Sequence, residues 1–461
     1  MSTELQAVKW QETRLRDVVT KLVDGSHNPP PKRDLGRPML SARNIENGRI
    51  IFDEFRLIDD DAFAAENART RITPGDVLLT IVGTIGRSAV VSQGIEHFAL
   101  QRSVAVLGPM STVLSKFLSY QLQAPRIQRH FQDSARGTAQ KGVYLKTLGE
   151  TPILLTSLDN QHRIVAEIEK QFSRLDQAVA SLQRVKAQLK RYKASVLKAA
   201  VEGRLVETEA QRTRRDGRGL ETGTELAAQG SANAAGDRKP GAALPYETGE
   251  QLLKRILDTR RSQWKGKGKY KEPAAPDASG LPELPEGWVW ASGAQLFAWS
   301  SGVNLPVKQL EGGDFPVYGG NGVNGWHTHA NVIQPTLVIG RVGAGCGNVN
   351  VLDREAWVTD NAIYATWVPQ ECSLSYLGMV FTTANLNSVA AGSGQPFVNQ
   401  TILNEVAAAV PPLVEQHRIV AEVDRRLSIV REVEAEVDAN LKRAQTLRQA
   451  VLARAFTGTS S

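Results

Sequence analysis

Two short segments of this 461-residue sequence have residue types that could do group-transfer chemistry. Asn28-Pro29-Pro30-Pro31 is similar to the tetrapeptide with which amino-methyltransferases hold a flipped base, but the fourth residue of that motif is aromatic for stacking, and here it is proline. The glycine-rich run from Gly343 to Gly347 follows a strand-like segment and leads into another, whereas a dinucleotide site requires a helix N-terminus after its glycines. A proline-rich loop and a glycine turn are the better interpretations.

The phosphate-binding and metal-binding motifs are also incomplete. The segment 83–88 lacks the lysine and the spacing of a phosphate loop. His327 and His329 form a close pair without a third ligand nearby, and the two cysteines, Cys346 and Cys372, are too few for a cysteine-rich metal site. We therefore expect a non-catalytic chain that binds no cofactor and no metal.

The elements that would position any site are duplicated. The heptapeptide beginning Gln161-His162-Arg163 recurs letter for letter at Gln416-His417-Arg418, and the register then holds without a gap. Toward the N-terminus from these heptapeptides, Gln140 aligns with Gln395, and this repetition favours a framework role for both glutamines. A seven-residue identity followed by a long ungapped alignment indicates a tandem duplication.

Each copy ends in a predicted long helix. The stretches 161–202 and 415–457 contain no proline or glycine, and Gly203 and Gly458 stand where the helices would stop. Apolar residues follow the 3–4 spacing of a coiled coil in both copies: Phe172, Leu175, Val179, Leu182, Leu189 and Val196 in the first, and Leu427, Val430, Val437, Leu441 and Val451 in the second.

Charged residues interrupt both apolar seams. Lys186 and Lys193 interrupt the first, and Glu434 and Arg448 the second. Because Lys186 aligns with Leu441, and Glu434 with Val179, the pattern favours packing of the two helices on each other over two homodimers. Taken alone, such helices are more often a generic solvated coiled coil, but the duplication of globule and helix favours a symmetric arrangement for a partner with two equivalent ends.

Short strand-like runs separated by turns precede each helix. The predicted fold is therefore α+β: two mixed α/β domains in a tandem pseudo-symmetric repeat, each followed by a long helix. The expected boundaries are a first domain at 1–158, its helix at 159–205, a linker with a short amphipathic helix at 206–284, a second domain at 285–413 and its helix at 414–461.

Composition agrees with an ordinary globular protein with a polyanionic partner. Charged residues make up 22% of the chain, the formal net charge is +7 and the isoelectric point is about 9.3. Such a balance suits nucleic acid, because neutralised phosphates release counterions, although a mildly basic protein without such a partner is the plain alternative. No apolar run approaches a membrane span and no secretory signal is present, which favours the cytoplasm.

The repeated helix starts, together with the segments Leu284–Trp288, Pro316–Gly322 and Gly75–Leu79, resemble the conserved regions of Type I restriction–modification specificity subunits. This resemblance covers nearly the whole chain. It implies that each globule is a target-recognition domain for one half of a bipartite, asymmetric site in double-stranded DNA. It also implies that the long helices form an antiparallel coiled coil that sets the spacer.

The resemblance further implies partner subunits that carry the chemistry. Two methyltransferase subunits would bind S-adenosylmethionine, and two restriction subunits would use ATP and Mg, while this chain would bind none of these. The helix starts at Gln161, His162, Arg163, Gln416, His417 and Arg418 are candidates for structure or for a subunit interface. The alternative function is a coiled-coil scaffold with only non-specific DNA affinity.

Side chains that read base edges or contact phosphate are expected among arginine, lysine, asparagine and similar polar residues. Candidates in the first domain are Lys32, Arg33, Arg43, Asn44, Thr84, Arg87, Arg102 and Lys141. Candidates in the second are Lys308, Tyr318, Asn321, Arg341 and Asn361.

Overall fold

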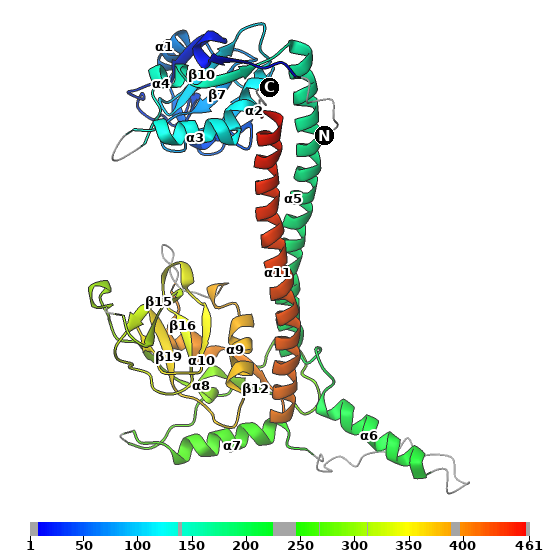
Figure 1. Ribbon diagram of the computed structural model, residues 1–461. Helices are drawn as coiled ribbons and strands as arrows, with labels where there is room; N and C mark the ends of the chain where they lie inside the picture. The colour runs from blue at the N-terminus through cyan, green and yellow to red at the C-terminus, as the bar shows by residue number, and fades with distance from the viewer. Residues whose placement is uncertain are drawn as a thin grey trace. The chain divides into compact units, whose positions relative to one another are not determined.

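The structure is a computed structural model, and it describes residues 8–136, 141–224, 246–266, 268–310, 312–388 and 397–457. Within the described residues the chain forms two compact units: residues 8–185 together with 436–457, and residues 186–435. Each unit contains one globule and one segment of each long helix (Figure 1). The expected glutamine pair Gln140 and Gln395 lies outside the described residues.

The first globule is an α+β domain built on a four-stranded sheet of order β2-β10-β7-β8 and a three-stranded sheet of order β6-β3-β9. Its elements are β1 (Gln11–Arg14), η2 (Leu15–Asp17), β2 (Val19–Asp24), β3 (Arg37–Leu40), η3 (Ala42–Asn44), β4 (Ile45–Glu46), β5 (Arg49–Ile50), β6 (Arg56–Ile58), α1 (Asp60–Thr70), β7 (Val77–Thr80), β8 (Ser88–Val90), β9 (Ala99–Leu100), β10 (Val104–Pro109), α2 (Ser115–Gln123), α3 (Pro125–Ser134), α4 (Leu145–Gly149) and β11 (Pro152–Leu155).

The second globule repeats this plan, with a four-stranded sheet β13-β19-β16-β17 and a three-stranded sheet β15-β14-β18. Its elements are β12 (Val289–Ser292), α8 (Gly293–Leu296), β13 (Ala298–Ser301), η5 (Val307–Gln309), β14 (Phe315–Gly319), β15 (Gly322–His327), β16 (Thr336–Gly340), η6 (Gly343–Gly345), β17 (Val349–Leu352), β18 (Trp357–Val358), β19 (Ala362–Trp367), α9 (Leu374–Thr383), η7 (Leu386–Ser388), α10 (Gln400–Glu405) and β20 (Ala407–Val410).

Each globule is joined to its helix by the same device. The first strand pairs antiparallel with the strand that directly precedes the long helix: β1 with β11, and β12 with β20. The central strands are buried on both faces, as in Val77–Thr80 and Thr336–Gly340. The predicted tandem of two mixed α/β domains, each followed by a long helix, is confirmed.

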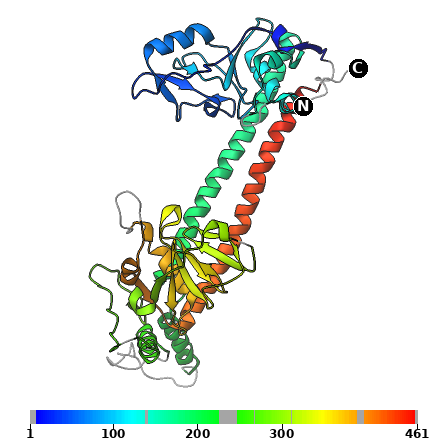
Figure 2. The ribbon, with the colours of Figure 1, turned by 90° about the vertical axis from the view of Figure 1, so that its left-hand side faces the viewer.

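The long helices are α5 (Leu158–Val201) and α11 (Leu413–Ala455). In the first unit, Ile164, Ile168 and Phe172 share a hydrophobic core with Leu452 of α11 and with Phe456, which directly follows that helix. Residue numbers on the two helices therefore run in opposite directions there, and Figures 1 and 2 show the segments side by side.

In the second unit, Val196 and Ala200 of α5 share a core with Ile419 and Val423 of α11, and again the numbers run in opposite directions. Figure 1 shows α9 between the sheet and α11. Two residues expected to interrupt separate seams meet here, because the Lys193 ammonium lies 2.6 Å from the Glu434 carboxylate.

The third interrupting residue is also accommodated. Arg448 lies over the Phe172 ring, 4.0 Å from its centroid, and pairs with Asp176 in the first unit. The Phe172 ring and the Asp176 carboxylate stabilise the guanidinium charge, while the aliphatic part of the Arg448 side chain packs in the seam.

The segment expected as a linker contains two helices, α6 (Glu209–Thr224) and α7 (Gly249–Ser262). A capping box at Thr248 and Gln251 starts α7, and Leu252 and Ile256 are fully buried in the core of the second unit. The short amphipathic helix expected here is thus three to four turns long and packs as part of the second globule.

The beginning of the linker and the start of the second domain are both fastened to the start of α11. The buried Glu415 carboxylate accepts hydrogen bonds from the Trp288 indole (3.1 Å) and from the backbone N–H of Glu209 (3.0 Å). Burial raises the pKa of Glu415, and Arg418 pairs with the Glu209 carboxylate beside it. Among the helices described, none is long and apolar enough to cross a bilayer.

Candidate nucleic-acid interface

Four segments of the first globule converge on a polar cleft of about 560 Å³, which we call the first corner. Three sequence candidates, Arg43, Thr84 and Arg102, line it together. The full lining is Ser26, His27, Pro29, Ser41, Ala42, Arg43, Val82, Gly83, Thr84, Gln101, Arg102 and Ser103.

A short capped turn fixes Arg43 at this corner. Ser41 and Asn44 form a capping box around η3, and the Ser103 hydroxyl accepts a hydrogen bond from the Ala42 backbone N–H at 3.0 Å. The Arg43 side chain is 67% exposed and lies 3.5 Å from Glu54, which is 86% exposed. An ion pair this open contributes little, so Arg43 is available to another acceptor.

The expectation that Asn44 contacts DNA requires correction. Asn44 is 1% exposed, and its amide donates to the carbonyls of Ile51 (3.0 Å) and Asp53 (2.8 Å). Because its hydrogen-bonding capacity is spent inside the fold, Asn44 is a positioning residue for the turn that carries Arg43.

Thr84 stands on a glycine turn after β7. Gly83 has a φ of 77°, which an L side chain adopts only with strain, and its N–H donates to the Lys141 carbonyl at 3.1 Å. That bond places the Lys141 backbone beside the first corner. Gln128 of α3 donates to the Gly86 carbonyl at 2.9 Å and fixes the far end of the turn.

The proline-rich loop forms one wall. Pro29 lines the first corner, and the Arg56 guanidinium donates to the Pro30 carbonyl at 2.6 Å. The interpretation of this segment as a loop is confirmed. Two candidates beside it, Lys32 and Arg33, lie outside the cleft.

Arg33 has a partner of its own in the Asp59 carboxylate, 3.2 Å away. A backbone hydrogen bond from Ala62, followed by that guanidinium, lowers the pKa of Asp59. Arg87 lies in a separate cleft of about 210 Å³, beside the Asn47–Gly48 hairpin turn. The structure therefore brings together some candidates of the first domain and separates Arg33 and Arg87 from them.

In the second globule three candidates lie on adjacent backbone, and we call this set the second corner. The Arg341 N–H donates to the Asn361 carbonyl at 2.9 Å. The Asn348 amide donates to the side-chain oxygen of Asn321 at 3.2 Å. Asn321, Arg341 and Asn361 are all exposed.

Close glycine packing brings these strands together. A Cβ on Gly340 would lie 2.2 Å from the Gly320 carbonyl oxygen, and one on Gly345 would lie 2.1 Å from the same oxygen. The glycine run 343–347 therefore serves backbone approach, and the glycine turn predicted there is confirmed.

The remaining two candidates of the second domain have other surroundings. The half-buried Tyr318 ring packs on the small core of Val338 and Val358, while its carbonyl accepts from the Thr359 N–H at 2.9 Å. Tyr318 therefore positions the second corner through its backbone. Lys308 is exposed on η5, away from the contacts that define the second corner.

The two corners occupy equivalent backbone positions. Strand β3 pairs in parallel with β9, and β14 with β18, so that Leu40 corresponds to Tyr318. Three residues further along each chain segment lie Arg43, in the short turn η3, and Asn321, in the hairpin turn between β14 and β15. After the second strand of each pair, Arg102 corresponds to Asp360, because the N–H groups of Val104 and Ala362 close the same turn.

Sequence reasoning missed several polar side chains at these positions. In the first corner they are His27, Gln101 and Ser103. Beside the second corner they are Asn348, which donates to Asn321, and Asp360, which directly precedes Asn361. Strand register identifies them, whereas letter-by-letter alignment does not. Within the described part of the chain, no group of three His, Cys, Asp or Glu side chains could hold a metal ion.

The repeated glutamines connect each globule to its helix. Gln161 is fully buried, accepts from the Leu114 N–H (2.9 Å) and donates to the carbonyls of Thr112 and Thr156. It has no surface for a subunit interface, so that part of the prediction is corrected to a structural role.

Gln416 repeats this arrangement. It is fully buried, accepts from the Ser373 N–H (2.9 Å) and donates to the Pro411 carbonyl (3.0 Å). The neighbouring His162, Arg163 and His417 are exposed, while Arg418 is engaged with Glu209.

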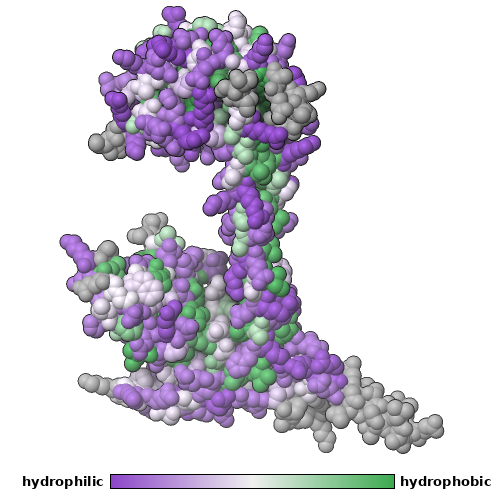
Figure 3. All heavy atoms as spheres, in the orientation of Figure 1, coloured by the Kyte–Doolittle hydropathy of each residue, from purple (hydrophilic) through white to green (hydrophobic). Residues whose placement is uncertain are grey.

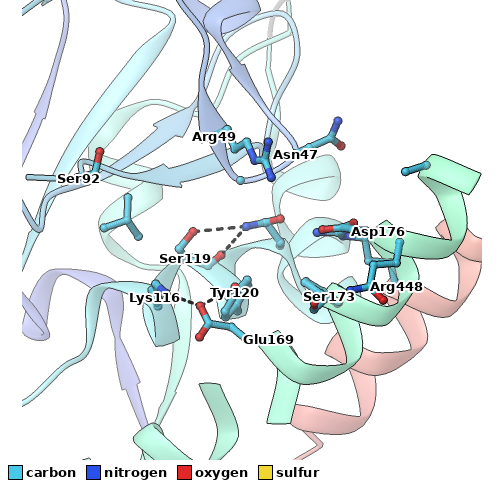
Figure 4. A pocket seen from close by; sticks show the side chains of 16 residues that line it. Asn47, Arg49, Ser92, Lys116, Ser119, Tyr120, Glu169, Ser173, Asp176 and Arg448 are labelled. Atoms are coloured by element: carbon cyan, nitrogen blue, oxygen red, sulfur yellow. Dashed lines mark hydrogen bonds and ion pairs between the residues drawn. The ribbon is translucent and has the colours of Figure 1, made fainter. Parts of the chain in front are cut away.

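A further cleft, of about 820 Å³, lies where the first globule meets its helices (Figure 4). Figure 4 shows Lys116 and Tyr120 of α2 directed toward Glu169 of α5, with Arg448 beside Asp176. Burial, together with the Glu169 carboxylate, raises the pKa of Tyr120 to about 12. These groups neutralise one another, which is typical of a joint between elements.

Comparison with known proteins agrees with this architecture. Residues 7–191 and 301–439 match the family model of the Type I restriction modification DNA specificity domain. The chain belongs to this family, as a specificity subunit of a Type I restriction–modification system.

Among relatives, the chain is 23% identical to the EcoKI specificity subunit of Escherichia coli K12, over 91% of this chain and 82% of that one. It is 27% identical to the Escherichia coli EcoBI specificity subunit, a match that spans only 42% of each chain. A chain from the solved structure described as "Structural basis underlying complex assembly and conformational transition of the type I R-M system" has the same fold, with a TM-score of 0.59, 18% identity and coverage of 97% of this chain and 98% of that one.

Proposed function

We propose that this chain is the DNA-reading, non-catalytic subunit of its complex, with each globule binding one half of a bipartite site in double-stranded DNA. The observation that carries the proposal is the pair of equivalent corners, which share a backbone frame and present different polar side chains. A common frame with different side chains suits two readers of two different short sequences.

The corners have the chemistry that major-groove recognition requires. Arginine donates two parallel hydrogen bonds to guanine, and asparagine both accepts from and donates to adenine. The net charge of +7 supplies general attraction to phosphate. We assign α5 and α11 the role of fixing the spacer between the half-sites.

The proposal places the methyltransferase and restriction subunits on the helices, with S-adenosylmethionine, ATP and Mg bound by those partners, in the cytoplasm. Exposed apolar side chains support a docking surface on the second-unit segment of α11, where Ile429 (51% exposed) and Val433 (39%) lie one turn apart. Figure 3 shows apolar patches over the helix surface, whereas the first globule is mostly hydrophilic on this face. The scaffold alternative is not favoured, because it leaves the polar corners without a role.

A domain exchange tests the proposal. Residues 285–413 are replaced by the corresponding domain of another member of the family, and the protected DNA sequence is determined with the partner subunits present. We expect one half-site to change and the other to stay. A change in both halves, or in neither, would contradict the assignment of one reader to each globule.

A further inference from the structure

We propose that the two corners recognise different base classes: the first corner reads guanine through Arg43, and the second reads adenine through Asn321. This inference rests on the proposed function and deepens it, because it assigns base chemistry to individual positions.

The first corner presents donors. Arg43 and Arg102 line the cleft together with His27, which lies 2.8 Å from the Asp24 carboxylate. Within the described residues no hydrogen bond or ion pair to the Arg102 guanidinium is found. Guanine offers two acceptors, N7 and O6, at the major-groove edge, and a planar guanidinium matches both.

The second corner presents amides. Asn321 accepts one hydrogen bond, from Asn348 at 3.2 Å, and an amide oxygen has two lone pairs. Among the residues that the structure describes, one acceptor position and the Asn321 amide donors therefore stay open for adenine, whose edge offers one donor and one acceptor. Asn361 is exposed on the adjoining backbone and adds a second amide.

Charge at the other equivalent position separates the corners further. The first has Arg102 where the second has Asp360. A carboxylate beside DNA is repelled by phosphate, and it is tolerated where it accepts from the exocyclic amine of cytosine or adenine. Asp360 therefore disfavours a guanine edge in the half-site that the second corner reads.

The experiment gives each corner the side chain that the other corner uses, at positions 43 and 321. Full-length wild-type protein, Arg43→Asn and Asn321→Arg, each with the partner subunits present, are used to select from a duplex library with a randomised central segment, in the presence of excess non-specific DNA. The enriched sequences are then compared position by position. Arg126→Asn and Gln370→Arg make the same kinds of change on exposed surface outside the corners and serve as matched controls.

We expect the wild type to enrich a bipartite motif with guanine in one half and adenine in the other. Arg43→Asn should lower the guanine preference at one position by about tenfold or more, the discrimination of one bidentate contact. Asn321→Arg should replace adenine by guanine at one position of the other half. The controls should reproduce the wild-type motif.

Two negative results have different meanings. A wild type that enriches no motif overturns both the proposed function and this inference. A wild-type motif that survives both exchanges, in variants whose circular dichroism and thermal unfolding match the wild type, overturns this inference alone.

Overall affinity provides a second readout with opposite signs. Arg102→Ala should weaken binding to all duplexes and reduce its salt dependence, because one phosphate-attracting charge is lost. Asp360→Ala should strengthen binding to unselected duplexes while lowering selectivity. Equal effects of the two substitutions would contradict the difference in charge between the corners.

Discussion

The two copies of this chain agree where a globule joins its helix and differ where a globule faces outward. Gln161 and Gln416 are both fully buried and make the same kind of hydrogen bonds to the globule ahead of them. Arg43 and Asn321 each follow the equivalent strands β3 and β14 by three residues, and they bring different chemistry to the surface. The contacts of these glutamines, which we call the joints, are therefore the same in both copies. The side chains of the corners differ between the copies while the joints stay the same.

The largest effects are expected at the joints. Gln161→Ala and Gln416→Ala each leave a buried N–H and buried carbonyls without partners, so each should lower the free energy of unfolding of its own unit by about 3 kcal/mol. Denaturant titration followed by circular dichroism measures this loss. Gln183→Ala, on an exposed face of α5, is the control and should leave stability unchanged. A loss in only one of the two variants would break the equivalence of the joints.

Intermediate effects are expected in the helix seams, where the two units use different polar pairs. Lys193→Ala leaves Glu434 half-buried without its partner and should destabilise the second unit by about 1–3 kcal/mol. Replacing both residues by leucine should restore stability, because apolar packing substitutes for the pair. Thermal unfolding of the single and double variants measures the difference. A double leucine variant that is less stable than Lys193→Ala would show that the ion pair stabilises the seam more than apolar packing does at these positions.

The smallest effect concerns a thiol that reports on one unit only. Both cysteines lie in the second unit, and burial raises the pKa of Cys372 to about 12. Since the folded pKa lies above the unfolded value of 9.0, this thiol contributes stability that is lost as pH rises above about 9. Cys372→Ala should flatten the decline in unfolding midpoint on the alkaline side.

The same thiol distinguishes the two joints. Gln416 lies 3.6 Å from the Cys372 sulfur, so Gln416→Ala should speed labelling of the native protein by a thiol reagent near neutral pH, while Gln161→Ala should not. Equal labelling rates in the two variants would mean that the joints are coupled, contrary to two units that open separately.

The long helices could be predicted from sequence because their signals are local. The absence of glycine and proline and the 3–4 apolar spacing are visible within a single helix. The identity between the copies then supports the same prediction for the second helix. The pairing of Lys193 with Glu434 could not be predicted in the same way, because each residue is an interruption in its own helix and a partner only across the pair.

The corners were only partly predictable, because equivalent positions lie at different spacings along the two copies. The first globule has the extra β4–β5 hairpin after Arg43, while the second continues directly from Asn321 into β15. Residue type alone also selected Asn44, which is suited to adenine but is buried in its own turn. Gln161 was repeated, as an interface residue would be, yet repetition reflects a shared burial site.

The first globule is covered partly by residues that are synthesised hundreds of positions after it. Leu452 and Phe456 are buried in its core, and the Phe456 ring contacts Phe117 with centroids 5.3 Å apart. A nascent chain leaving the ribosome therefore carries an uncovered apolar face on its first globule until α11 has emerged. Because exposed apolar surface favours aggregation of incomplete chains, chaperone protection during that interval should raise the yield of folded protein in a cell.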